Sequence, residues 1–123
     1  MLKKSIEVSK KARYFTIGNS SNEISKVWFV LHGYAMLSEF FIQKFKNLDD
    51  GKSLIIAPEA LNRFYIDGSY NRVGASWMTK EERENDIDEN INYLNSVLEN
   101  IINEIGHNNF ELNILGFSQG GAT

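Results

Sequence analysis

The C-terminal stretch Leu112-Asn-Ile-Leu-Gly-Phe-Ser-Gln-Gly-Gly-Ala-Thr123 joins an apolar, strand-like run to a glycine-rich turn. Its centre, Gly116-Phe-Ser-Gln-Gly120, has the pattern G-x-S-x-G. After a strand, this pattern is typical of a sharp strand-to-helix turn that lifts a serine hydroxyl out of a sheet. The two glycines suit such a turn because side chains there would collide with the neighbouring strand and helix. We therefore predict a strand over 109–117, a helix from Gln119 onward and an exposed hydroxyl at Ser118.

Two earlier apolar runs, Lys26–Leu31 and Ser53–Pro58, predict the other main strands. Continuous apolar runs of this length are typical of strands that are covered on both faces in a parallel α/β sheet. An apolar stripe between the two runs predicts a helix over 39–47, with Ser38 as its N-cap.

The strongest helical pattern in the chain precedes the last strand. Thr79-Lys-Glu-Glu82 matches a capping box and predicts the start of this helix, and Gly106 is the expected C-cap. Apolar residues recur at steps of three and four between these points, at Ile87, Ile91, Leu94, Leu98, Ile101 and Ile105.

Residues 3–9 and 12–18 alternate in polarity and predict an antiparallel pair of strands at a sheet edge. Residues 59–78 follow neither the helical nor the strand period, and we expect an ordered, functional loop over one end of the sheet. Alternating strands and helices predict one domain over 1–123, with a three-layer α/β fold and a mostly parallel sheet that has an antiparallel N-terminal edge.

Composition excludes several classes of function. The formal net charge of -3 argues against nucleic-acid binding driven by bulk charge. The chain has no cysteine and two histidines, so neither a thiolate nucleophile nor a histidine-rich metal site is expected, and we predict no metal or cofactor. No apolar stretch is long enough to span a membrane, and no signal peptide is recognisable, so the expected location is cytoplasmic.

The chemistry expected of such a turn is acyl transfer. A serine hydroxyl becomes a good nucleophile when a base removes its proton, and backbone N–H groups stabilise the oxyanion of the tetrahedral intermediate. The N–H of Gln119 is one expected donor, and that of Tyr34, which follows His32-Gly33 at the end of an earlier strand, is the second. His32 is expected to be structural rather than the base. The alternatives for the turn are a plain glycine-serine turn and a phosphate-binding loop, although it lacks the lysine and spacing of a P-loop.

Four segments together resemble the phospholipase/carboxylesterase family of α/β-hydrolases, which includes small bacterial esterases and acyl-protein thioesterases. They occur in the family's order and are Leu31-His-Gly-Tyr34, Ala57-Pro-Glu-Ala60, Ser76-Trp77 and Gly116-Phe-Ser-Gln-Gly-Gly121. The family more often has Gly-Asp where this chain has Ala35-Met36. The resemblance implies an α/β-hydrolase fold, Ser118 as nucleophile and an oxyanion hole formed by Tyr34 and Gln119. It also implies a substrate pocket walled by the loop that carries Trp77. From the residues alone, Tyr65, Tyr70 and Trp77 have two alternative roles, lining of this pocket and packing within the loop.

The resemblance further implies that the triad's acid and histidine follow Ser118 in the chain. The 123 residues would then correspond to the N-terminal part of an esterase of carboxylic esters, lysophospholipids or thioesters, inactive by itself. His107 is expected at the far end of its strand, about 30 Å from the hydroxyl. An open edge of the last strand would favour self-association. The alternative function is a non-catalytic binding or assembly module.

Overall fold

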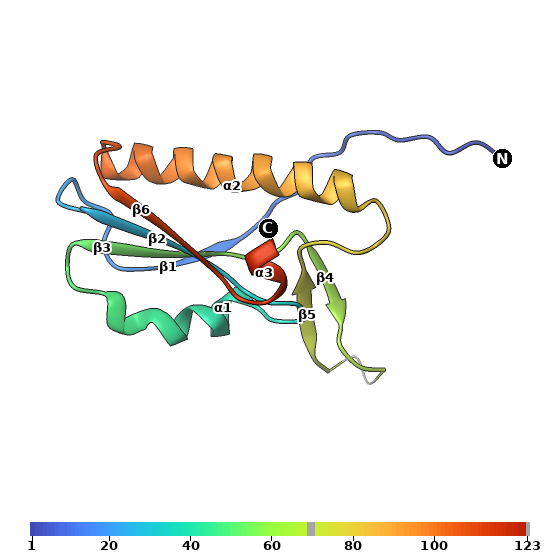
Figure 1. Ribbon diagram of the computed structural model, residues 1–123, viewed down its shortest axis with the longest axis horizontal. Coiled ribbons are helices and arrows are strands. Elements are labelled where there is room, and N and C mark those ends of the chain that lie inside the picture. The colour runs from blue at the N-terminus through green and yellow to red at the C-terminus, as the bar shows by residue number, and fades with distance from the viewer. Residues whose placement is uncertain (69–70, 123) are drawn as a thin grey trace.

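The computed structural model describes residues 1–68 and 71–122 (Figure 1). Its elements in chain order are β1 (Tyr14–Ile17), β2 (Lys26–Leu31), α1 (Ser38–Phe41), the 3-10 helix η1 (Ile42–Leu48), β3 (Ser53–Pro58), β4 (Asn62–Tyr65), β5 (Val73–Ser76), α2 (Arg83–Ile105), β6 (Glu111–Gly116) and α3 (Gln119–Ala122). The main strands and the long helix therefore lie where the apolar patterns predict them.

The main sheet has the strand order β1-β3-β2-β6. β2 pairs in parallel with β3 on one side and with β6 on the other, whereas β1 runs antiparallel to β3. This confirms a mixed α/β architecture with a mostly parallel sheet and an antiparallel N-terminal edge. Every residue of β3 is buried, as expected for an inner strand of such a sheet.

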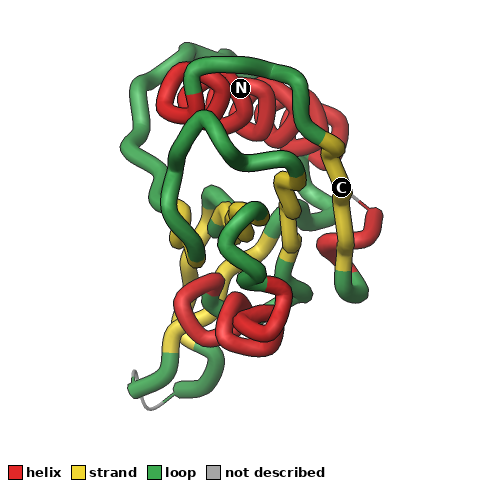
Figure 2. Tube along the Cα trace, turned by 90° about the vertical axis from the view of Figure 1, so that its left-hand side faces the viewer, coloured by secondary structure: helices red, strands yellow, loops and turns green. Residues whose placement is uncertain are grey.

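Helices cover both faces of this sheet, as Figures 1 and 2 show. On one face Val97, Ile101 and Ile105 of α2 pack against alternate residues of β2 and β3. On the other face Phe41 of α1 and Ile42 of η1 pack against the remaining residues of the same strands. The chain leaves β2 toward β3 and then passes back across β2 to reach β6. Crossovers of one handedness that step in opposite directions place their helices on opposite faces.

This reversal of direction also defines where a ligand is expected to bind. In open α/β sheets, ligands bind outside the carboxyl ends of the strands, where the order of strands reverses. β2 ends at Leu31, next to His32, and lies between β3, which leads to Glu59, and β6, which leads to Ser118. Because β3, β2 and β6 run in the same direction, these residues lie at one edge of the sheet.

The N-terminal prediction is wrong in part. Residues 3–9 form no strand and lie exposed, although their polarity alternates. The strand predicted over 12–18 exists as the shorter β1, but its partner is β3, with Phe15 opposite Ala57. The buried β3 edge offers apolar neighbours that residues 3–9 could not, and sheet pairing depends on such neighbours more than on alternation.

Residues 59–78 contain a second, two-stranded sheet that the sequence pattern does not reveal. β4 pairs antiparallel with β5, with Phe64 opposite Gly74. Each strand has four residues, too few to establish a period of two. Tyr70 falls outside the described residues. The segment is therefore ordered, as expected, but as a β-hairpin instead of an irregular loop.

The predicted helix caps are also wrong. Ser38 lies inside α1, after Leu37 at the N-cap, and no side chain caps that helix. α2 begins at Arg83 instead of after Thr79, and its N-cap is Glu82 in a left-handed conformation. Gly106 is confirmed as the C-cap, with φ 90°. No helix in the described part of the chain is both long and apolar enough to cross a membrane.

The buried face of α2 is rotated from the predicted stripe. Ile101 and Ile105 are buried as expected, but Ile91 is 50% exposed. Asn90 takes a buried position instead, at 1% exposure. A polar side chain in a core requires a hydrogen-bond partner, and that of Asn90 is a carbonyl in the loop before α2.

Candidate active site

The turn between β6 and α3 holds Ser118 in an uncommon backbone conformation. Ser118 has φ 55°, in the left-handed region that residues other than glycine rarely adopt. The N–H of Phe117 donates to the Leu31 carbonyl at 3.0 Å, and the N–H of Gly120 donates to the Phe117 carbonyl at 3.0 Å. The surrounding structure thus holds a conformation that costs about 1–3 kcal/mol. The Ser118 residue is exposed.

The glycines of this turn lie against backbone. A Cβ on Gly116 would lie 2.3 Å from Gly121 Cα, and one on Gly120 would lie 2.3 Å from the Leu31 carbonyl oxygen. Backbone atoms of a paired strand and of a short helix cannot move aside as flexible side chains can. The predicted reason for these two glycines, close approach of strand and helix, is confirmed.

The loop after β2 lies against this turn. A Cβ on Gly33 would lie 3.0 Å from Cδ1 of Phe117. The hairpin fixes the loop from the other side: the N–H of Ala35 donates to the Ala75 carbonyl, and the N–H of Ala75 donates to the Met36 carbonyl, both at 3.0 Å. The structure therefore brings together the two segments that carry the expected oxyanion donors.

Tyr34 follows Gly33 in this loop, and its side chain is 56% exposed. Its ring packs against Phe64 of the hairpin, with centroids 5.2 Å apart. Ala35 has φ 64°, the left-handed region that favours glycine. This is the position where the family that the sequence resembles more often has glycine. The role of the Tyr34 N–H as an oxyanion donor stays a prediction.

Gln119, the first residue of α3, joins the turn to the loop that precedes α2. Its Oε1 accepts from the N–H of Trp77 at 2.8 Å, and its Nε2 donates to the Met78 carbonyl at 2.8 Å and to Ser76 Oγ at 3.2 Å. Trp77 Nε1 in turn donates to the His32 carbonyl at 2.8 Å. The side chain of Gln119 therefore positions the site, a role that the sequence pattern does not reveal.

Trp77 is 1% exposed and lies at the centre of these contacts. Its ring stacks on that of His32, with centroids 5.1 Å apart. Its carbonyl accepts from Asn90 Nδ2 of α2 at 2.9 Å. These contacts give Trp77 a structural role between the two loops and α2, and its predicted contact with substrate stays a prediction.

His32 is fully buried, and both ring nitrogens contact backbone groups. Nε2 accepts from the N–H of Ala60 at 3.0 Å, so Nδ1 carries the proton and donates to the Gly33 carbonyl at 2.7 Å. Burial lowers the pKa of His32, although the Gly33 carbonyl and the charge of Glu59 act in the opposite direction. These contacts agree with the structural role expected for His32.

The lowered pKa of His32 predicts a loss of stability in mild acid. Between its folded pKa and the unfolded value of 6.5, the unfolded chain binds a proton that the folded chain does not. The free energy of unfolding must therefore fall as the pH decreases below about 6.5. We expect urea unfolding to show lower stability at pH 5.5 than at pH 7.5. The difference should shrink in His32→Asn and persist in His107→Asn, and equal differences in both variants would contradict this account.

The described residues place no base beside Ser118. No carboxylate or imidazole in residues 1–68 and 71–122 hydrogen-bonds to its hydroxyl. His107 lies in the turn before β6, at the other end of that strand, where Nε2 contacts the Asn22 carbonyl and Nδ1 accepts from the N–H of Asn109, both at 3.0 Å. Within the same residues, no three His, Cys, Asp or Glu side chains form a group that could hold a metal ion.

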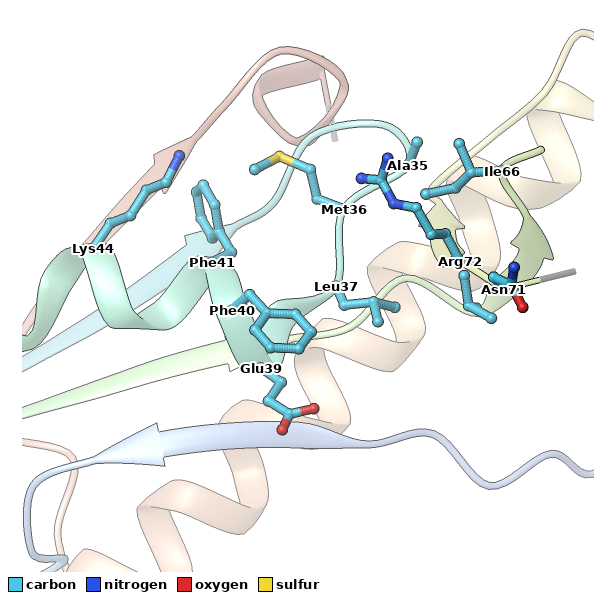
Figure 3. Close-up of a pocket in the computed structure, with 11 residues that line it drawn as sticks. Ala35, Met36, Leu37, Glu39, Phe40, Phe41, Lys44, Ile66, Asn71 and Arg72 are labelled. Atoms are coloured by element: carbon cyan, nitrogen blue, oxygen red, sulfur yellow. The ribbon is translucent and has the colours of Figure 1, made fainter. Parts of the chain in front are cut away.

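A cavity of about 680 Å³ opens between α1, the loop after β2 and the hairpin (Figure 3). Its lining is mainly apolar, with three charged side chains, and comprises Ala35, Met36, Leu37, Glu39, Phe40, Phe41, Lys44, Ile66, Asn71, Arg72 and Val73. Phe41 also packs against Phe117, with ring centroids 6.2 Å apart, and Lys44 Nζ lies 5.6 Å from the Phe117 ring centroid. The cavity therefore lies next to the residue that precedes Ser118.

The hairpin lines part of this cavity through Ile66, Arg72 and Val73, which the sequence did not single out. The expected role of residues 59–78 as the wall of a substrate pocket stays a prediction. Tyr65 is 55% exposed and is not part of the lining.

In comparisons with known proteins, no family model and no curated protein matches the chain.

Proposed function

We propose that the chain has the α/β-hydrolase arrangement and acts as a serine hydrolase of carboxylic esters, of carboxylesterase, lysophospholipase or thioesterase type. The observation that carries this proposal is the backbone of Ser118, with φ 55° in a turn fixed by Gly116 and Gly120. A strained strand-to-helix turn that exposes a hydroxyl at the carboxyl end of a sheet serves nucleophilic attack. A plain connecting turn has no need of such strain.

In the proposed reaction, Ser118 Oγ attacks the carbonyl carbon of the ester, and its proton passes to a base. The carbonyl oxygen becomes an oxyanion that the N–H groups of Tyr34 and Gln119 stabilise. Collapse of the tetrahedral intermediate releases the alcohol or thiol and leaves an acyl-enzyme, which water then hydrolyses. The base and the acid that orients it lie outside the described residues in this proposal.

The neighbouring cavity favours an ester substrate that has an apolar group. Its walls include Met36, Leu37 and Phe41, and it has the size of a small-molecule site, which is commonly about 300–1,000 Å³. Its place beside Phe117 would let the apolar part of a substrate lie next to the reacting carbonyl.

The test is covalent labelling of Ser118 by a fluorophosphonate, located by mass spectrometry of the peptides. Without a base at the hydroxyl, labelling by this chain is expected to be slow. Added imidazole should accelerate it, because a soluble base can take the proton that no side chain among the described residues accepts. Ser118→Ala should lose the adduct completely, whereas Ser5→Ala, which removes an exposed serine, should keep it.

A folded sample that gives no adduct at Ser118 in the presence of imidazole would contradict the proposed function. It would favour the second candidate, a non-catalytic binding or assembly module. One observation favours that candidate: β6 pairs only with β2 among the described strands, and its Leu112, Ile114 and Leu115 are 41%, 66% and 43% exposed. An edge of this kind can add a strand from a partner.

A further inference from the structure

A second cavity, of about 330 Å³, lies beyond the carboxyl end of β3. Its lining is Lys10, Lys11, Ala12, Arg13, Glu59, Ala60, Leu61 and Arg63. Four cationic side chains against one carboxylate leave a formal excess of three positive charges. The chain as a whole carries a formal net charge of -3, so the cavity opposes the charge of the molecule that contains it.

The single carboxylate of this cavity is already neutralised. Glu59 is 2% exposed, and Arg13 donates to its two oxygens from Nε at 2.6 Å and from Nη2 at 3.1 Å. The N–H and the hydroxyl of Ser38 add contacts to Oε1 at 3.3 and 3.4 Å. A bidentate arginine pair of this kind is fixed in geometry. The Arg13–Glu59 pair therefore forms a rigid part of the cavity wall that carries no net charge.

The other three cations lack an equivalent partner. Arg63 Nη1 lies 3.6 Å from Glu59 Oε2, beyond hydrogen-bond distance, and its side chain is 45% exposed. Within the described residues, Lys10 and Lys11 make no ion pair. Three positive charges that face one small cavity repel one another unless an anion enters.

We propose that this cavity binds a phosphate-type oxyanion, held by Lys10, Lys11 and Arg63 above the Arg13–Glu59 pair. Guanidinium and ammonium groups are the side chains that bind phosphate oxygens in proteins, the first in a fixed fork and the second as a point charge. The site is separate from Ser118, because its lining includes no residue of the turn at Ser118. Its Ala60 donates its N–H to the His32 ring.

Anion binding has a structural consequence. Lys10 and Lys11 belong to an exposed N-terminal segment without regular structure, whereas Arg63 belongs to β4. An anion that contacts all three would tie the segment to the hairpin. Binding should therefore protect the peptide bonds after Lys10 and Lys11 from trypsin.

The experiment titrates the Ser118→Ala chain with inorganic phosphate at constant ionic strength, by calorimetry and by the rate of trypsin cleavage after Lys10 and Lys11. We expect saturable binding with matching protection, which weakens as salt is added. Arg63→Gln should weaken binding about tenfold or more and remove the protection, because it deletes a charge-assisted hydrogen bond. Lys80→Ala, which removes an exposed lysine outside the cavity, should change neither result.

A glycerol phosphate titration distinguishes the source of the phosphate group: tighter binding than inorganic phosphate identifies a phosphate ester as the ligand, and weaker binding identifies the free ion. Absence of saturable binding at millimolar phosphate, or an Arg63→Gln variant that binds as the parent chain does, would overturn the proposal. Circular dichroism of Arg63→Gln checks that this half-exposed substitution leaves the fold intact. Neither result depends on whether Ser118 is a nucleophile.

Discussion

Gly120→Ala is expected to lower the free energy of unfolding by about 3 kcal/mol or more, and to abolish labelling of Ser118. The added Cβ would lie 2.3 Å from the Leu31 carbonyl oxygen and 2.4 Å from that of His32. Leu31 is the last residue of β2 and His32 follows it, so the clash can be relieved only by moving α3 away from this end of the strand. That movement would also displace the N–H of Gln119. Urea unfolding followed by tryptophan fluorescence measures the loss.

Gly68→Ala is the matched control for this substitution. No atom of the described residues lies within 4 Å of a Cβ at Gly68, so its effect should stay within about 0.5 kcal/mol. If the two variants unfolded at the same urea concentration, α3 would not be packed against β2 as the structure has it. The proposed turn at Ser118 would then lose its structural basis.

The parts of the fold that could be predicted from sequence are those that local patterns specify. Residues 26–31 and 53–58 are continuous apolar runs, and each forms the expected strand within the parallel sheet. Gly106 ends α2 because it can adopt the left-handed conformation that a helix C-terminus commonly requires. Each of these structural features depends on a few residues that are neighbours in the sequence.

The hairpin could not be predicted in the same way, because distant contacts stabilise it. Gly74 of β5 lies so close to the loop after β2 that its Cβ would be 2.5 Å from the Ala35 carbonyl oxygen. Backbone hydrogen bonds join Ala75 to Ala35 and Met36, 40 and 39 residues earlier in the chain. Nothing in the local sequence of β5 indicates such partners. The local sequence of residues 3–9 is equally uninformative, because these residues alternate in polarity but pair with none of the described strands.

The candidate site likewise has one part that the sequence predicts and one part that it does not. G-x-S-x-G identifies Ser118 and explains both glycines from local geometry, and the structure agrees on the turn. The partners of the Gln119 side chain lie in a loop more than 40 residues earlier. The indole of Trp77 likewise donates to His32, 45 residues earlier. An amide or an indole can find a hydrogen-bond partner in many environments, so its residue type does not specify which one it contacts.

Trp77→Ala is expected to lower the free energy of unfolding by about 3–5 kcal/mol, the usual cost of removing a fully buried aromatic side chain. Trp77 is 1% exposed, stacks on His32 and donates to the His32 carbonyl. Its removal leaves a cavity and an unpaired carbonyl at the point where both loops of the site meet α2. Trp77→Phe keeps much of the packing but loses the hydrogen bond, and should cost about 1–3 kcal/mol.

Trp28→Ala is the control that separates this effect from the loss of any tryptophan. Trp28 lies in β2, is only partly buried and packs at the margin of the core, so its loss should cost less than that of Trp77. Urea unfolding followed by circular dichroism compares the variants without relying on tryptophan emission. If Trp77→Ala were no less stable than Trp28→Ala, the contacts of Trp77 would not hold the site together. Since Gln119 is linked to the loop after β2 through Trp77, a large effect would instead mean that positioning of the candidate site and stability of the fold depend on the same side chain.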